Sequence, residues 1–196
     1  MAIDKKNITK LRQATGAGLV DIKNALEEAG GDEQKAIEIL RKTGASKAAK
    51  KIAERTTGEG LVHTYIHSNG KVGAMVQIQC ETDFVARNED FKALAHDIAM
   101  HITAVAPFYI APADVPAGEI KKEKEIYREQ LKTEGKPADM LDKIVAGKVE
   151  KFYREVCLLK QTFIKDDKVT IEKLIEEAIA KMGEKIEIIN FSRFQI

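Results

Sequence analysis

A short segment, residues 80–88, separates two stretches of the chain in which apolar side chains repeat with different periods. Residues 61–82 alternate between apolar and polar positions, as expected for strands that bury one face. Beyond residue 88 the apolar residues recur every three or four positions, as they do along a helix that buries one side. These helical positions are Phe91, Leu94, Ala95, Ile98, Ile102 and Val105. The change of period predicts an α+β fold with a strand-to-helix corner at residues 80–88.

The corner carries an acidic residue followed directly by a large aromatic residue, Asp83 and Phe84. A corner of this kind can project side chains from a rigid scaffold, where binding groups are often placed. The same pattern also fits a structural role, in which Phe84 packs under the helix and Asp83 caps it. Spacing alone leaves both roles open and favours the structural one.

The strands of residues 61–82 turn at Asn69 and Gly70, a pair that is the preferred centre of a tight type I′ turn. In this register His67 lies opposite Val72. One face of the hairpin then contains Leu61, His63, Tyr65, His67, Val72, Ala74, Val76 and Ile78. These residues predict an antiparallel hairpin.

The four histidines do not predict a metal site. His63 and His67 are four residues apart on one strand, roughly 13 Å, which is too far for both to bind one ion. His96 and His101 are five residues apart on the predicted helix, so their side chains point in different directions. We therefore expect no metal, and no other cofactor.

Three short helices with glycine between them are predicted near the N-terminus, at residues 8–13, 19–29 and 33–42. Asp32 is a suitable N-cap for the third helix. The pattern predicts a three-helix bundle as a first domain, residues 1–54. On its second helix an inward stripe is expected, with Val20 about 100° away from it and exposed. The stripe consists of Leu19, Ile22, Leu26 and Ala29.

Residues 41–55 contain six basic residues and one acidic residue, Glu54. The stretch lacks the interleaved aromatic residues that stack on bases, and the rest of the chain offsets its charge. It is therefore interpreted as a solvated helix and linker, and no direct contact with nucleic acid is expected. Residues 56–60 contain two glycines and mark the start of a second domain, residues 55–196.

The second half of the chain predicts an antiparallel helical hairpin at residues 118–160. A charged helix, residues 118–133, is followed by a reversal at residues 135–137. The return helix has an apolar stripe at Val145, Val149, Phe152, Val156 and Leu159. A further helix and a final strand at residues 185–194 follow, and we expect this strand to complete a small antiparallel sheet that helices cover.

Composition narrows the class of protein. The net charge of +1 gives no strong field toward nucleic acid or anionic lipid. The chain shows no secretion signal and no apolar run long enough to cross a membrane, and its two cysteines, Cys80 and Cys157, form no paired pattern. A cytoplasmic location is expected. No hydrolase, metalloprotease or phosphate-loop motif is present, so we expect a binding protein and not an enzyme.

Five segments of the sequence form a distinctive set. The most distinctive is Thr82-Asp83-Phe84-Val85-Ala86-Arg87-Asn88. The others, in chain order, are Leu11–Gly18, Ala45–Lys51, Gly135-Lys136-Pro137 and Asn190–Phe194. The first three of these five, residues 82–88, 11–18 and 45–51, closely resemble the bacterial elongation factor Ts family, and the last two resemble it less tightly. Their order over nearly the whole chain makes a chance match improbable.

The resemblance implies a set of contacts with the GTPase elongation factor Tu. The N-terminal bundle is similar to a ubiquitin-associated module that grips the G domain, through Arg12, Leu19 and Val20. The positions Thr82, Asp83, Phe84 and Val85 match the segment that disturbs the Mg²⁺ and phosphate site. His67 matches a second contact, and the helical hairpin corresponds to a coiled-coil arm that projects from the core.

The resemblance thus implies a guanine-nucleotide exchange factor in translation. Two alternatives stay open. One is an adaptor without exchange activity, whose N-terminal module binds ubiquitin-like folds and whose helical hairpin binds another protein. The other is a small enzyme with dispersed catalytic residues. Longer family members carry two related core subdomains, whereas this chain has one hairpin, residues 61–82. A lone small sheet exposes an edge and an apolar face, so a symmetric homodimer is expected.

Overall fold

A computed structural model describes residues 5–196 and has a mixed helical and β architecture, which confirms the α+β prediction. The chain divides into two compact units, each built from several segments. The first contains the N-terminal residues up to Thr64, Met75–Asp97 and Lys173–Ser192. The second contains Tyr65–Ala74, Ile98–Glu172 and Arg193–Ile196.

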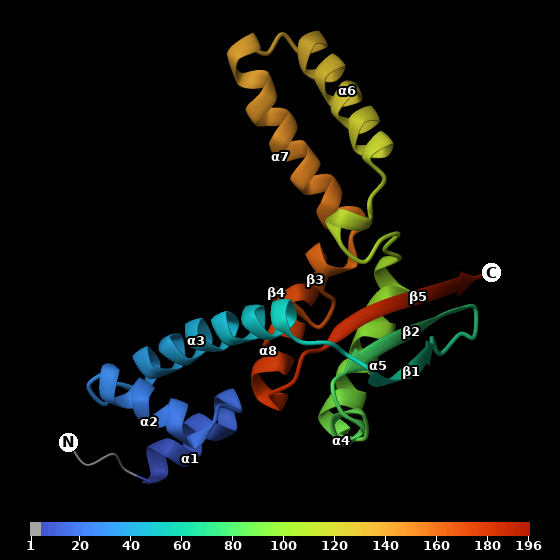
Figure 1. The fold of residues 1–196 in the computed structure, drawn as a ribbon. Helices are drawn as coiled ribbons and strands as arrows, with labels where there is room; N and C mark the ends of the chain where they lie inside the picture. Colours follow the sequence, from blue (N-terminus) through green and yellow to red (C-terminus); the bar gives the residue numbers. More distant parts are fainter. Residues whose placement is uncertain (1–4) are drawn as a thin grey trace. The chain divides into compact units, whose positions relative to one another are not determined.

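Three helices form the N-terminal bundle of the first unit: α1 (Lys5–Thr15), α2 (Leu19–Glu28) and α3 (Glu33–Glu54) (Figure 1). Asp32 caps α3, because its side chain accepts hydrogen bonds from the backbone N–H groups of Gln34 and Lys35 at 2.9 and 3.1 Å. The bundle encloses its own core. The buried residues are Leu11, Ile22, Ala25, Leu26, Ala36 and Leu40.

The third helix of the bundle is much longer than predicted. The sequence indicated an end near residue 42, but α3 continues to Glu54. Residues 45–53 consist largely of alanine and lysine, which favour helix strongly enough to continue past Gly44. Ala48, on this extension, is fully buried.

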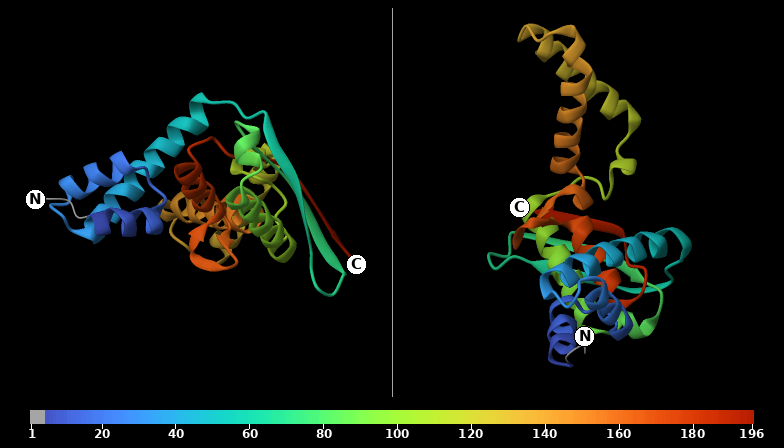
Figure 2. Two further views of the ribbon diagram at one scale, coloured as in Figure 1. Left: turned by 90° about the horizontal axis from the view of Figure 1, so that it is seen from below. Right: turned by 90° about the vertical axis from the view of Figure 1, so that its left-hand side faces the viewer.

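The main sheet has three strands in the order β1 (Glu59–Ile66), β2 (Val72–Cys80) and β5 (Glu187–Gln195), with β2 in the middle. The left view of Figure 2 shows β1 and β2 as a long hairpin with β5 alongside. The prediction that the last strand joins the hairpin is confirmed. Alternate residues of β2 are buried, namely Ala74, Val76, Ile78 and Cys80.

The register of the hairpin is confirmed, but the type I′ turn is wrong. The backbone N–H of His67 donates to the Val72 carbonyl at 2.9 Å, as the register requires. A type I′ turn needs positive φ at both central residues. Gly70 has φ +67°, whereas Asn69 is not among the described residues with positive φ. Instead the Gly70 N–H closes a turn onto the His67 carbonyl at 2.8 Å, and the Asn69 side chain accepts from the Lys71 N–H at 3.0 Å.

Helix α5 (Glu89–Val105) follows the corner and confirms the predicted period. Of the six predicted apolar positions, Phe91, Leu94, Ala95, Ile98 and Ile102 are buried, and the sixth, Val105 at the end of the helix, is exposed. Helix α8 (Ile171–Met182) buries Ile171, Ile175 and Ile179 at the same kind of spacing.

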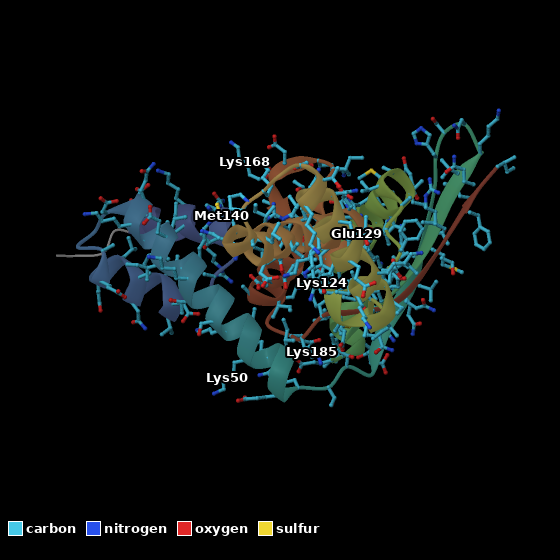
Figure 3. All side chains as sticks on the ribbon, turned by 90° about the horizontal axis from the view of Figure 1, so that it is seen from above. Lys50, Lys124, Glu129, Met140, Lys168 and Lys185 are labelled. Atoms are coloured by element: carbon cyan, nitrogen blue, oxygen red, sulfur yellow. The ribbon has the colours of Figure 1, made fainter. Side chains whose placement is uncertain are left out.

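The second unit contains the predicted helical hairpin, formed by α6 (Ala117–Thr133) and α7 (Ala138–Val156). The two helices run side by side in opposite directions (Figure 1), around buried Leu131, Val145 and Val149. Their outer faces are charged, and Figure 3 labels Lys124 and Glu129 on α6 and Met140 on α7.

The sequence did not predict a second sheet, which pairs β3 (Thr162–Phe163) with β4 (Asp166–Thr170). The remaining elements are a one-turn helix, α4 (Asp83–Ala86), and two 3₁₀ turns, η1 (Pro112–Asp114) and η2 (Leu158–Lys160).

Candidate functional site

The strand-to-helix corner forms around a helix of a single turn. Strand β2 ends at Cys80, and α4 begins at Asp83. Thr82 is the N-cap of α4, and its hydroxyl accepts a hydrogen bond from the Val85 N–H at 3.4 Å. Ala86 is the buried residue of this turn, so the turn is fixed from below by a small side chain.

Phe84 points into solvent from this turn. Its exposed fraction is 82%, although phenylalanine is among the residues most often buried. Asp83 lies beside it and pairs with Arg87 at 3.1 Å, one helical turn along. The structural role that spacing favoured is therefore wrong in both parts. Thr82 provides the cap, and Phe91 on α5, not Phe84, is the buried phenylalanine.

Two carboxylates join the corner to the loop between α8 and β5, Glu184 from the loop and Glu81 from the corner. Glu184 Oε2 accepts from the N–H groups of Glu81 and Thr82 at 3.1 and 3.0 Å, and Oε1 accepts from the Thr82 hydroxyl at 2.6 Å. In return the Glu81 carboxylate accepts from the Lys185 N–H. Sequence reasoning missed these partners because they are more than 100 residues apart in the chain.

Arg55 completes this cluster. Its guanidinium lies 3.1 Å from both Glu81 carboxylate oxygens and 3.4 Å from the Gly183 carbonyl. Burial alone would raise the pKa of Glu81, but the hydrogen bond from the Lys185 N–H and the charge of Arg55 outweigh it and lower that pKa. Glu81 therefore stays ionised and keeps accepting these bonds.

The three residues assigned to docking flank the loop between α1 and α2. Arg12 is exposed in the last turn of α1, while Leu19 and Val20 begin α2 with exposed fractions of 48% and 69%. The expectation that Leu19 lies in the inward stripe is wrong. Ile22, Ala25 and Leu26 form the buried stripe, and Leu19 lies one turn before it at the helix start.

His67 is exposed at the turn of the hairpin, in the second unit. Its Nδ1 lies 3.4 Å from the Tyr65 hydroxyl, and the two rings are 6.4 Å apart. His67 is exposed and Tyr65 half-buried, so the pair presents an aromatic ring that is suited to a protein contact.

A different pair of histidines is brought together by the fold. His63 on β1 and His96 on α5 approach to 3.2 Å between Nε2 and Nδ1. Spacing along the chain did not predict this pair, because the two histidines are 33 residues apart and lie on different elements. Burial, and then the neighbouring His96, lower the pKa of His63. Over residues 5–196 no group of three or more His, Cys, Asp or Glu side chains is arranged to hold a metal ion.

The first unit also contains a cavity of about 460 Å³ lined by the α1–α2 loop, α3, α5 and α8. Its charged side chains include the pairs Lys47–Asp21 at 2.7 Å and Lys181–Asp90 at 2.8 Å. We assign no ligand to it.

Among the described helices, none is both long and apolar enough to span a bilayer.

The sequence is similar to known proteins over its whole length. The family model described as "Elongation factor TS" matches residues 6–196. The chain is 56% identical to the Elongation factor Ts of Fervidobacterium nodosum over 196 residues, which is 100% of this chain and 99% of the relative. It is 52% identical to that of Thermosipho melanesiensis over 194 residues, covering 99% and 98% of the two chains. It is also 52% identical to that of Thermotoga petrophila over 196 residues, covering 100% and 97%.

Proposed function

Because the chain belongs to the elongation factor Ts family, and is therefore a translation elongation factor, we propose that it promotes the release of GDP from elongation factor Tu. The protein acts by binding and not by chemical catalysis, and it needs no cofactor of its own. Its place of action is the cytoplasm, where translation takes place.

The observation that carries this proposal is the exposed Phe84 on the one-turn helix α4. An isolated protein gains nothing in stability from a phenylalanine in water, whereas a partner that buries the ring gains the transfer free energy of a large apolar side chain. Aromatic side chains on a fixed scaffold are frequent hot spots of protein interfaces. The hydrogen bond from the Thr82 hydroxyl to Glu184 and the buried Ala86 give α4 such a scaffold.

The proposed mechanism is an allosteric one. A GTPase holds the phosphates of GDP with Mg²⁺ and with backbone N–H groups of a loop and a helix. In our proposal the segment Thr82–Val85 inserts beside this site, with Phe84 and Asp83 displacing the elements that hold the ion. By linkage, a factor that binds the nucleotide-free form more tightly lowers GDP affinity by the same ratio.

Two further surfaces belong to the proposal. Arg12, Leu19 and Val20 dock the N-terminal domain, residues 1–54, on the G domain in the manner of a ubiquitin-associated module. His67 makes a second contact from the core, residues 55–196. The exposure of all four side chains supports these roles.

We also propose that the working form is a homodimer. Several strand residues are apolar and exposed, which is costly for an isolated sheet. They are Val62 and Ile66 on β1, Met75 on β2 and Phe194 on β5. A second copy around a twofold axis would cover such a surface.

Release of a fluorescent GDP analogue from elongation factor Tu tests the proposal directly. We expect the purified protein to accelerate release many-fold at catalytic concentrations. The alternative, an adaptor without exchange activity, predicts co-elution with elongation factor Tu and an unchanged release rate. No binding and no acceleration would contradict both.

A further inference from the structure

The loop between α8 and β5 supplies a carboxylate to the backbone of the functional corner. This loop contains Gly183, whose φ of +84° lets the chain reverse after α8. Glu184 follows at once and is half-buried. Its two oxygens accept three hydrogen bonds, from the Glu81 N–H, the Thr82 N–H and the Thr82 hydroxyl.

These three donors belong to the only two residues between β2 and α4. Glu81 and Thr82 lie beyond the end of the strand and before the first residue of the helix, so neither element supplies their N–H groups with a partner. Hydrogen bonds to an ionised acceptor are roughly twice as strong as neutral ones. Glu184 therefore fixes the direction in which the chain leaves the sheet.

We call the hydrogen bonds between residues 81–82 and residues 184–185 the clamp. Bonds run in both directions between the two segments, which makes the clamp more rigid than three bonds on one side chain. The Glu81 carboxylate accepts from the N–H of Lys185, the residue after Glu184. Arg55 joins both chain segments, through the Glu81 carboxylate and the Gly183 carbonyl. Rotating the corner would break several of these bonds together.

We infer that Glu184 is a positioning residue for nucleotide exchange, which holds Asp83 and Phe84 at the angle required for insertion. The inference rests on the function proposed above. Glu184 acts through the backbone of Thr82 and needs no contact with elongation factor Tu. Because a misplacement of about 1 Å can reduce a rate by roughly a hundredfold, loss of this clamp should impair exchange without removing any contact residue.

The test compares Glu184→Ala and Glu184→Gln with the wild type and with Glu177→Ala, an exposed acid on α8. The rate of GDP release is measured against the concentration of the exchange factor. For Glu184→Ala we expect a maximal rate about tenfold lower and a half-saturating concentration changed less than about twofold, since the docking side chains are intact. Glu177→Ala should match the wild type.

Two readouts separate positioning from general stability. Hydrogen exchange at the amides of Glu81 and Thr82 should become faster in Glu184→Ala, while the amides of α5 keep their protection. Glu184→Gln retains one carbonyl oxygen, which can still accept from the Glu81 and Thr82 N–H groups, and should recover part of the maximal rate. A rescue by glutamine is not expected if Glu184 contributes only charge to the surface.

A folded Glu184→Ala variant with the wild-type maximal rate overturns the inference. If Glu184→Ala does not fold, Glu184→Gln decides. Faster amide exchange at Thr82 together with an unchanged rate of GDP release in that variant overturns the inference. A wild-type protein that leaves GDP release unchanged overturns the proposed function and this inference together. An active wild type with a fully active Glu184→Ala variant overturns the inference alone.

Discussion

Phe84 and Phe91 are seven residues apart and occupy opposite environments, since one side chain is 82% exposed and the other is completely buried. The first belongs to α4 and the second to the first turn of α5. The same residue type is therefore exposed at one position, where we propose a contact with elongation factor Tu, and buried at the other, which provides a matched pair of substitutions.

Phe84→Ala should leave stability nearly unchanged and reduce acceleration of GDP release at least about tenfold, as expected for a hot-spot aromatic residue. Phe91→Ala should instead destabilise the fold by about 3–5 kcal/mol through loss of core packing. Thermal unfolding, recorded beside the release assay, checks both. A sharp fall in the melting temperature of Phe84→Ala would contradict the contact role.

Val20→Ser should weaken binding to elongation factor Tu by several-fold, because an exposed apolar contact on the docking surface is lost, while the melting temperature changes little. Met140→Ser is the control, since Met140 is also an exposed apolar residue but lies on the helical hairpin. Titration calorimetry compares the two affinities. Equal affinities for both variants would argue against the docking surface.

Removal of residues 1–54 should weaken binding to elongation factor Tu and leave a folded core. The reason is that the helices of this segment enclose their own core cluster. Circular dichroism and the binding assay are the measurements. An aggregated core, or one with full affinity, would count against the division at residue 54.

Protonation of His101 should lower the stability of the protein in mild acid. It is fully buried, and burial lowers its pKa below 6.5 despite the hydrogen bond to Gln161, which acts in the opposite direction. Its Nδ1 accepts from the Ile164 N–H at 3.3 Å, so Nε2 carries the proton and donates to the Gln161 Oε1 at 3.0 Å. Protonation of Nδ1 would break the first bond.

The direction of this pH dependence follows from linkage, because the folded state favours the neutral ring of His101. The stabilising contribution of His101 is complete above the pKa of 6.5 that it has in the unfolded chain. It is lost as the pH falls through the lower pKa of the folded state. Urea unfolding at a series of pH values should show this loss, and His101→Gln should flatten the profile. It should flatten only partly, since the pKa of His63 is lowered as well. His67→Gln, at an exposed histidine, is the control.

The homodimer predicts a mass of about twice 21.8 kDa in sedimentation equilibrium at micromolar concentration. Phe194→Asp should shift the equilibrium to the monomer, since it places a charge among exposed apolar strand residues. A wild-type protein that sediments near 21.8 kDa with full exchange activity would rule the dimer out.

Features set by neighbouring residues could be predicted from the sequence. The period of α5, the cap at Asp32 and the pairing of His67 with Val72 each depend on a few adjacent positions, and all three are observed. The exposure of Phe84 could not be derived in this way. Spacing does not distinguish a long helix from a one-turn helix followed by another, and the break between α4 and α5 decides which phenylalanine is buried.

Features set by distant segments could not be predicted. The clamp joins residues 81–82 to residues 184–185, and nothing local to either segment indicates the other. The short sheet of β3 and β4 is similar, since its two-residue strand is too brief to show a period. The resemblance points to the proposed contact residues, but not to the side chains that hold them in place.

The two cysteines of the chain should react only slowly with thiol reagents. Cys80 and Cys157 are both completely buried, and burial raises the pKa of each thiol to about 11. The thiolate is the reactive form of cysteine, so alkylating dyes and mild oxidants should not modify either thiol in the folded protein. A single cysteine introduced at an exposed position such as Met140 would therefore take a fluorophore selectively, with both native thiols left in place.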